Sequence, residues 1–598
     1  MGQRQSNGSL DWESDWKHVS RRGVARNVTD FDNLLEALAA APGDRPFVTF
    51  WVDEDERETL TFAEFRSRAH AEAAVLSSHR LGVGDRVVIV MPQNIAAMTA
   101  FVGAMMLGAV PAFLAYPNFK VEPSKYRAGL AGVSANLKAK AVIIDEDFPP
   151  EFLEHIAIDR ETAVLRAGRC PQLLSETQLP PLERHADDLA FIQHSAGTTG
   201  LQKGVALTHG AVLRQIQHLA EALKIDGATD RIYNWLPLYH DMGLIACFML
   251  PMVCHVPIVM QSPLDWVMRP EIMLQIISEY KCTLAWMPNF AFQFVPRRTR
   301  PNSRAEYDLS SLRALINCSE PVRSSSLSEF RDAFAPAGLS GNALQSSYAM
   351  AENVFAVTQS DIQETSGVTQ IWAQSQAFRG EGRVVPVAEG AVGAISFASS
   401  GRLLTGNEIR IVSEARETLA DGLVGEVQLK SDSLFTGYFN RPDLTGKAMS
   451  DEWYLTGDLG FCLGGELFVA GRKKDLLIVG GENLYPQDIE ETIATHSAIH
   501  DGRVVVFGLY NPALGTEEII AVAEVENEDF LAHGLEIDGE IRKRVIEGIG
   551  IAMRTVLLKP PGWIVKSTAG KSARSATREK LLKEHPELNL EARETQSV

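Results

Sequence analysis

The chain has 598 residues, enough for several domains, and its 45% hydrophobic content is ordinary for a globular protein. Its formal net charge of −19 at pH 7 argues against a general nucleic-acid-binding surface and against stable association with an anionic membrane. The six cysteines show no C-x-x-C spacing, so neither a zinc site nor a disulfide framework is indicated, and we expect reduced thiols in a cytoplasmic protein.

The N-terminal half alternates between predicted helices and strands. Thr61 and Glu64 form a T-x-x-E capping box, which predicts a helix to about residue 78. Short apolar runs indicate strands at 87–91, 109–116, 141–145, 189–194, 283–288 and 314–321. The uncharged stretch 95–116 could span a bilayer by length, but it is rich in Ala and Gly and contains Pro111, which favours a buried helix and a strand. This alternation predicts an α/β fold with parallel sheets.

The pattern changes after about residue 400. Short alternating strands separated by Gly and charged turns follow one another as EIRIVS, GEVQLKS, ELFVAGR and DLLIVG. They fit an antiparallel or barrel-like unit. After GRKKD (471–475) the chain returns to mixed α/β, with a helix IEETIAT, strands RVVVFGLY and EIIAVAEVE, and a helix near 538–553. We therefore predict two domains, 1–473 and 474–598, the second long enough to fold separately.

A flexible, hydroxyl-rich loop with one cation follows the predicted strand LAFIQ. This loop, HSAGTTGLQKG (194–204), has the composition of a polyphosphate-binding loop. A P-loop would read G-x-x-x-x-G-K-[ST]. Counted from Gly197, the second glycine is replaced by Gln202 and the magnesium-binding hydroxyl by Gly204. A P-loop nucleotidase is therefore disfavoured.

Four further motifs follow this loop in order. They are LPLYHDMG (236–243), SYAMAE (347–352), YLTGDLG (454–460) with GRKKD after it, and KSTAGK (566–571). Each has an ordinary explanation by itself: Glu352 as a solvated carboxylate, Asp458 as a turn residue and Lys571 as a surface lysine. Five motifs in register between residues 195 and 571 argue for one shared function instead.

In these motifs the sequence resembles the acyl-adenylate-forming superfamily, which includes acyl-CoA synthetases, luciferases and nonribosomal adenylation domains. The resemblance extends from about residue 30 to 580. It implies a large N-terminal domain of two parallel α/β sheets plus a small β-barrel, followed by a small mobile α+β domain hinged at Lys474. It also implies a reaction in which a carboxylate attacks the α-phosphate of ATP, pyrophosphate leaves and an acyl-AMP remains.

The resemblance implies which residues handle the phosphates and the chemistry. The β- and γ-phosphates would be bound by the loop, through Ser195, Gly197, Thr198, Thr199, Gly200 and Lys203. Mg²⁺, a hard cation that prefers oxygen ligands, would be held by Glu352 with Thr198. Lys571 would reach the α-phosphate and the attacking carboxylate together, and His240 would lie near that carboxylate and gate the acyl pocket.

The same resemblance implies a nucleoside site. Tyr348 would stack on adenine, whose edge would meet the chain near Ser319 and Glu320. Asp458 would accept hydrogen bonds from both ribose hydroxyls, with Arg472 beside it.

Within the superfamily, LPLYHDMGLI, YAMAE and GGENLYPQDIE look most like the fatty acyl-AMP ligases. These transfer their acyl group to the phosphopantetheine thiol of a holo acyl carrier protein. The long segment 353–400 resembles the insertion typical of that branch; its structural alternative is a surface loop. Two other functions stay open: an acyl-CoA synthetase that uses free CoA, and an inactive nucleotide-binding scaffold.

The acyl substrate is a fatty or related carboxylic acid by resemblance only. Five aromatic side chains could wall an apolar tunnel or belong to the core, and the sequence does not decide between the two: Trp266, Trp286, Phe290, Phe292 and Phe294.

Overall fold

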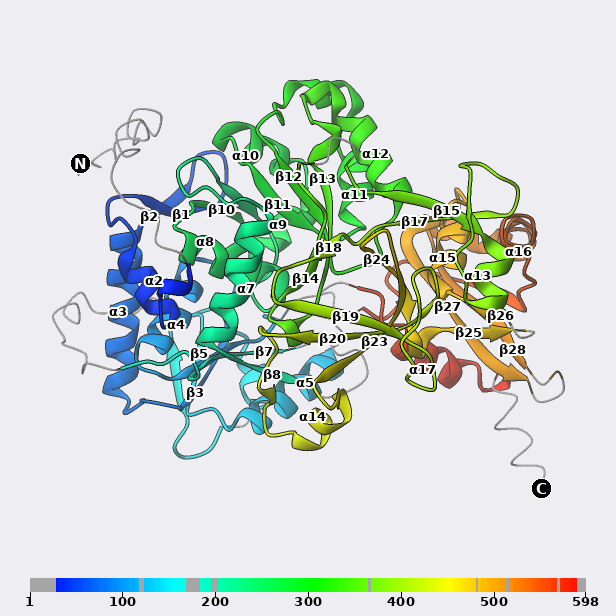
Figure 1. The fold of residues 1–598 in the computed structure, drawn as a ribbon. Coiled ribbons are helices and arrows are strands. Elements are labelled where there is room, and N and C mark those ends of the chain that lie inside the picture. Colours follow the sequence, from blue (N-terminus) through cyan, green and yellow to red (C-terminus); the bar gives the residue numbers. More distant parts are fainter. Residues whose placement is uncertain are drawn as a thin grey trace.

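The computed structural model describes residues 28–117, 123–156, 158–167, 183–194, 203–363, 367–479, 482–511, 514, 516–566 and 571–588. The chain runs from N-terminal helices at one edge, through a central block, to a C-terminal part at the opposite edge (Figure 1). Parallel sheets make up the large N-terminal part, and the C-terminal part is small. The predicted α/β class is confirmed.

The largest sheet has nine strands, and its central part is parallel. Its order is β18 (Arg402–Leu403), β14 (Ala356–Gln359), β13 (Leu344–Ala349), β12 (Ala314–Asn317), β11 (Leu284–Met287), β9 (Ile232–Asn234), β10 (Ile258–Gln261), β1 (Pro46–Trp51) and β2 (Arg57–Thr61). The strands from β13 to β1 pair in parallel, whereas β14, β18 and β2 pair antiparallel at the edges. The strands β9, β10, β11 and β12 are buried along their whole length, as expected for a parallel sheet that is covered on both faces.

A second parallel sheet has four strands, β4 (Val110–Phe113), β3 (Arg86–Val90), β5 (Ala141–Ile144) and β6 (Ala163–Arg166). Beside β4 lies β7 (Leu189–His194), which belongs to an antiparallel sheet with β8 (Gly204–Thr208) and β21 (Gly437–Tyr438). The predicted glycine-rich loop therefore connects the two paired strands β7 and β8.

The helices of the N-terminal part include the two that the sequence predicts, α3 (Phe62–Ser78) and α4 (Ile95–Met106). The others are α2 (Leu34–Ala40), α5 (Pro123–Leu137), α6 (Pro150–Leu153), α7 (His209–Ala222), α8 (Leu250–Cys254), α9 (Pro263–Met268), α10 (Ile272–Tyr280), α11 (Ala291–Arg298), α12 (Ser324–Phe334), α13 (Ser375–Glu381) and α14 (Pro442–Ala448). The capping box at Thr61 and Glu64 is present at the start of α3.

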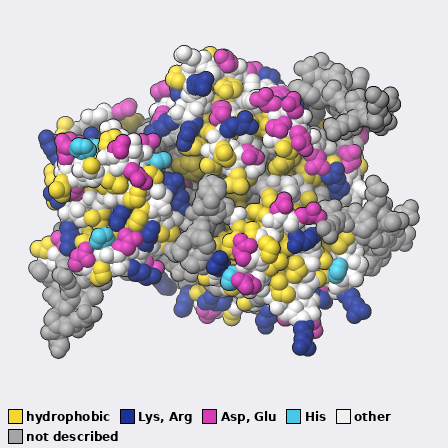
Figure 2. All heavy atoms as spheres, turned by 180° about the vertical axis from the view of Figure 1, so that it is seen from behind, with side chains coloured by type: hydrophobic (Ala, Val, Ile, Leu, Met, Phe, Trp, Pro, Cys, Tyr) yellow, Lys and Arg dark blue, Asp and Glu magenta, His cyan; other side chains and the backbone are white. Residues whose placement is uncertain are grey.

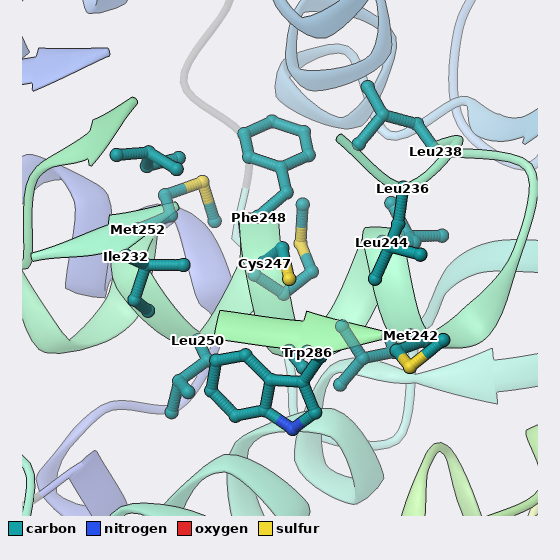
Figure 3. Close-up of a cluster of buried hydrophobic side chains, with 14 of the residues drawn as sticks. Ile232, Leu236, Leu238, Met242, Leu244, Cys247, Phe248, Leu250, Met252 and Trp286 are labelled. Carbon is teal, nitrogen blue, oxygen red and sulfur yellow. The ribbon is translucent and has the colours of Figure 1, made fainter. Parts of the chain in front are cut away.

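Two long apolar stretches, 95–116 and 244–260, belong to the core. Residues 95–116 form α4 and β4, and α4 packs closely on α3. The second stretch includes most of a π-helix, η3 (Met242–Met249), whose Phe248 and Cys247 lie among other buried apolar side chains (Figure 3). In the described part of the chain, no helix has both the length and the apolar character needed to cross a membrane.

The predicted barrel-like unit is an antiparallel sheet of β19 (Asn407–Val412), β20 (Gly425–Ser431), β23 (Trp453–Leu463), β22 (Met449–Ser450) and β24 (Glu466–Arg472). Beside it, β16 (Pro386–Val387), β15 (Gln370–Gln374) and β17 (Ala394–Ala398) form a small sheet together with α13. The segment 353–400, predicted to be an insertion, is therefore divided. Its first strand, β14, belongs to the nine-stranded sheet, and only the part between Gln370 and Ala398 forms a separate unit.

The C-terminal part has its own apolar core. It contains β25 (Leu477–Val479), β26 (Glu482–Leu484), α15 (Pro486–Ala494), β27 (Ile499–Asn511), β28 (Thr516–Val525), α16 (Gly534–Ile549), β29 (Thr555–Lys559) and α17 (Arg574–Glu584). The assignment of DLLIVG to the barrel-like unit was wrong. Within this run, residues 477–479 form β25, which pairs with β26, and Leu477 is buried in the C-terminal core. The domain boundary at residue 474 stays a prediction.

The structure places the charged side chains and five of the cysteines. On the face shown in Figure 2, acidic and basic side chains are interspersed with apolar ones. The five cysteines within the described residues are free thiols, of which Cys247, Cys282 and Cys318 are buried.

Gly401 offers a test of the packing between β14 and β24. Its φ is +97°, and an added Cβ would lie 2.3 Å from the backbone of Gln359 and Ser360. We expect Gly401→Ala to destabilise the protein by about 1–3 kcal/mol because of backbone strain and the clash. Gly380 in α13 faces open space and serves as the control. Thermal unfolding should show a lower midpoint only for Gly401→Ala, and equal midpoints would mean that position 401 accommodates a side chain without strain.

Candidate functional site

Three of the predicted site residues form one bonded cluster. Asp458 on β23 and Arg472 on β24 are cross-strand partners, and their side chains form an ion pair with Nε–Oδ1 at 2.8 Å. The Tyr348 hydroxyl, at the end of β13, donates a hydrogen bond to the other carboxylate oxygen of Asp458 at 2.5 Å. The side chain of Asp458 is only 6% exposed, whereas that of Arg472 is 58% exposed.

The electrostatics of this cluster follow from burial and pairing. Burial raises the pKa of Asp458, and the Arg472 guanidinium and the Tyr348 hydroxyl offset part of that rise. The Asp458 carboxylate raises the pKa of Arg472, so this side chain stays cationic. Burial, followed by the Asp458 charge, raises the pKa of Tyr348 well above its ordinary value, so Tyr348 remains a neutral donor. The cluster therefore offers hydrogen-bonding groups around a buried carboxylate.

A second cluster surrounds Glu352, which lies just after β13. The Tyr438 hydroxyl donates to Glu352 Oε1 at 2.6 Å and lies 3.3 Å from the Tyr454 hydroxyl. The Lys203 ammonium lies 4.5 Å from the centre of the Tyr438 ring, within the range of a cation–π contact. The structure thus brings Lys203 and Glu352, far apart in sequence, to the same tyrosine, Tyr438. The sequence motifs include Tyr454, the first residue of YLTGDLG, but they do not include Tyr438, so sequence reasoning missed Tyr438.

A third cluster joins the C-terminal part to the N-terminal part. The Lys571 ammonium donates a hydrogen bond to the backbone carbonyl of Ser319, just after β12. Ser319 has φ +71°, a left-handed conformation that is uncommon for a residue with a side chain and often occurs at functional sites. Because β12 pairs in parallel with β13, Ser319, just after β12, and Tyr348, at the end of β13, lie at the same edge of the sheet.

The third cluster also contains Asp241, which sequence reasoning did not select although it stands in LPLYHDMG. Its carboxylate caps η3 by accepting from the Met242 N–H, and it pairs with His240 Nδ1 at 2.5 Å. Burial raises the pKa of Asp241, but the charges of His240 and Lys571 outweigh it and hold the pKa below its ordinary value. Asp241 therefore stays anionic and attracts the Lys571 ammonium.

Other predicted residues lie apart from these clusters or outside the described chain. The Glu320 carboxylate accepts from the Phe290 N–H at 3.0 Å, at the start of α11. Lys474, the predicted hinge, is exposed in the 3-10 turn η8 (Lys473–Asp475). Five loop residues lie outside the described residues: Ser195, Gly197, Thr198, Thr199 and Gly200.

The aromatic residues left open by the sequence divide between core and surface. Trp286 and Phe292 are fully buried, and Trp286 lies against Leu250 and Met242 (Figure 3). Trp266 is also buried and stacks on Trp235 with ring centres 3.6 Å apart. Phe290 is 36% exposed. Trp286 and Phe292 are core residues, whereas Trp235, Trp266 and Phe290 form an aromatic group that reaches the surface.

Residues 35–439 match the family model described as AMP-binding enzyme. The chain belongs to the AMP-binding enzyme family. Enzymes of this family use ATP. The family match, together with the similarity to a fatty acyl-adenylate ligase structure, confirms the predicted resemblance to acyl-adenylate-forming enzymes.

The relatives of this AMP-binding enzyme cover nearly its whole length. The long-chain-fatty-acid–AMP ligase FadD32 of Mycolicibacterium smegmatis is 29% identical, over 91% of this chain and 93% of the relative. The medium-chain-fatty-acid–[acyl-carrier-protein] ligase JamA of Moorena producens is 31% identical, over 88% and 91%. A solved structure from studies of fatty acyl-adenylate ligases of E. coli and L. pneumophila is 28% identical with a TM-score of 0.86, covering 94% of this chain and 99% of that one.

Proposed function

We propose that this protein uses ATP to convert a fatty or related carboxylic acid into acyl-AMP and then transfers the acyl group to the phosphopantetheine thiol of a holo acyl carrier protein. The observation that carries the proposal is the contact of Lys571 with the Ser319 carbonyl. It brings a cation from the C-terminal part to the sheet edge that also holds Tyr348. The similarity to FadD32 and JamA supports the substrate and the acceptor.

The first half-reaction brings two anions together. A carboxylate oxygen bonds to the α-phosphorus of ATP while the bond from that phosphorus to the bridging oxygen breaks, and pyrophosphate leaves. The site must offset repulsion in the transition state and hold an in-line geometry. Lys571 is suited to the first task because its ammonium carries a full charge and can bridge both anions. His240, paired with Asp241, lies near Lys571 and is suited to orient the incoming carboxylate.

The nucleotide is proposed to lie across the first two clusters. Asp458 and Arg472 would bind the ribose, and Tyr348 the adenine. Lys203 and the loop that precedes it would bind the β- and γ-phosphates. The side chain of Arg472 is accessible enough to meet a ligand, and Asp458 presents a carboxylate that already accepts hydrogen bonds.

Magnesium fits the Glu352 cluster in its chemistry. Mg²⁺ takes one or two protein carboxylates together with phosphate oxygens and waters, so it does not need a cage of protein ligands. Among the described residues there is no group of three or more His, Cys, Asp or Glu side chains placed to hold a metal. Glu352, close to the Lys203 side chain through Tyr438, is the proposed carboxylate ligand, together with Thr198 of the loop. The ion would neutralise phosphate charge when bound.

We propose that the choice between a carrier protein and free CoA as acyl acceptor depends on the unit between Gln370 and Ala398. This unit contacts the C-terminal part. Phe378 packs against Tyr485 with ring centres 5.6 Å apart, and Arg379 donates to the Ile549 carbonyl at 2.8 Å. These contacts restrain the C-terminal part, which must reorient before a thiol reaches the acyl-AMP. A carrier protein adds binding energy from its own docking surface, and that energy can offset the cost of reorientation.

Replacing Lys571 tests the first half-reaction. We expect Lys571→Ala to slow acyl-AMP formation on the order of 10²–10³-fold, by analogy with the loss of one charged oxyanion donor, while ATP binding and fold are retained. The measurement is pyrophosphate release with a panel of fatty acids. Lys543→Ala removes an exposed lysine paired with Glu547 and is the control. Pyrophosphate release by Lys571→Ala at the rate of the unmodified enzyme would refute the assignment.

Variants of Asp458 and Glu352 should lose activity for different reasons, one through ATP binding and the other through Mg²⁺ binding. Asp458→Asn removes a charged acceptor and should raise the KM for ATP, whereas Glu352→Gln should raise the Mg²⁺ concentration needed for half-maximal activity. Titrating ATP at saturating Mg²⁺, and Mg²⁺ at saturating ATP, separates the two effects. Each variant serves as the control for the other. Unchanged titrations in both would place the nucleotide elsewhere.

The choice of acceptor can be read from the products. With fatty acid, ATP, Mg²⁺ and CoA, we expect the intact enzyme to accumulate acyl-AMP, and to acylate a holo carrier protein when one is added. Arg379→Ala, which loses the contact with Ile549, should release some acyl-CoA. Arg383→Ala, which loses an ion pair with Glu381 inside the same unit, is the control. Efficient acyl-CoA formation by the intact enzyme would identify an acyl-CoA synthetase, and nucleotide binding without pyrophosphate release would identify a scaffold.

A further inference from the structure

An ion-pair cluster outside the three clusters above joins helix α12 to helix α15 of the C-terminal part. The Arg323 guanidinium lies 3.1 Å from Asp488 Oδ1 and 3.3 Å from Glu491 Oε2. The Ser325 hydroxyl donates to the other carboxylate oxygen of Glu491 at 2.9 Å. One side chain thus contacts two carboxylates on successive turns of α15, and a neighbouring hydroxyl reinforces the second contact.

Arg323 is held firmly on the N-terminal side. Its backbone N–H donates to Asn289 Oδ1, and Asn289 in turn donates to the Ser326 hydroxyl. Its side chain is only 23% exposed, which limits screening by solvent. Burial lowers the pKa of Arg323, but Asp488 and Glu491 outweigh it, so the pKa is raised and the charge is retained. The ion pairs therefore have one fixed partner and one partner on α15.

Helix α15 is connected to Lys571 by a second arginine. Arg574, at the start of α17, pairs with Glu490 Oε1 of α15 at 2.7 Å and with Asp475 Oδ2 at 2.8 Å. Arg574 also donates to the Val506 carbonyl in β27. Lys571 stands three positions before Arg574. A displacement of α15 would therefore move the segment that carries Lys571.

Two contacts from the C-terminal part, one from Lys571 and one from α15, reach the same short segment of the N-terminal part, residues 319–323. Ser319 accepts from Lys571, and Arg323, four positions later, binds α15. Two contacts spaced along one body fix its orientation better than either contact alone, because the second contact opposes rotation about the first.

We propose that Arg323 is a positioning residue: its ion pairs with Asp488 and Glu491 hold α15, and through Glu490 and Arg574 also Lys571, in the orientation that forms acyl-AMP. The inference rests on the proposed function. The pairs must separate before the thiol-transfer step, since Lys571 then has to leave the reacting carbon accessible. Loss of the pairs thus lowers the population competent for the first half-reaction and does not lower the population competent for the second.

The two half-reactions provide the test. We expect Arg323→Ala to slow pyrophosphate release on the order of tenfold, equivalent to about 1.4 kcal/mol of lost docking free energy. Transfer from preformed acyl-AMP to a holo acyl carrier protein, measured separately, should be unchanged or faster. Arg323→Lys keeps one charge and should restore part of the first rate. Arg297→Ala, which removes the pair with Glu329 on α12, is the matched control and should affect neither rate.

A physical measurement separates this inference from the proposed function. Amide hydrogen exchange should become faster in α15 and at the start of α12 in Arg323→Ala, and not in Arg297→Ala, whether or not an acid substrate has been found. Failure of the unmodified enzyme to release pyrophosphate would defeat the proposed function alone. Equal slowing of both half-reactions, or unchanged exchange in α15, would overturn the role of Arg323.

Discussion

The site depends on one hydrogen bond between parts of the chain that have separate apolar cores, from the Lys571 ammonium to the Ser319 carbonyl. An ammonium that leaves water needs partners, and here a carbonyl and the nearby negative charge of Asp241 provide them. The cation therefore reaches the sheet edge only when the C-terminal part is docked. Assembly of the site and orientation of the C-terminal part are the same event.

Sheet geometry explains why the other site residues meet there. The carboxyl ends of parallel strands share one edge, so the residues after β12 and those at the end of β13 are neighbours, as the pairing of Asn317 with Ser346 shows. The antiparallel register of β23 and β24 places Asp458 opposite Arg472. Tyr348 joins the two sheets through its bond to Asp458. A ligand at this edge would thus contact groups fixed by two independent sheets.

The sequence predicts this fold where local patterns decide it. The capping box at Thr61 and the apolar runs of the parallel strands are local, and both are confirmed. Strand pairing is not local: DLLIVG alternates like a barrel strand, yet its residues 477–479 pair with β26 in the C-terminal part. Asp241 and Tyr438 were missed for the same reason, since each matters through atoms contributed by distant segments, Lys571 and Glu352. Motifs identify candidate residues, and only the fold identifies their neighbours.

The buried charges of the site are already paired within the protein. Asp458 is bonded to Arg472, and Asp241 to His240. An unpaired charge at such depth would cost several kcal/mol, so pairing preserves both the fold and the ionised form of Asp241. A nucleotide that binds here would replace one hydrogen-bonding partner of a buried side chain with another, and it would not meet an unpaired charge. In the proposed function, its affinity would then reflect a difference between two sets of hydrogen bonds, one made with the protein's own side chains and one made with the nucleotide.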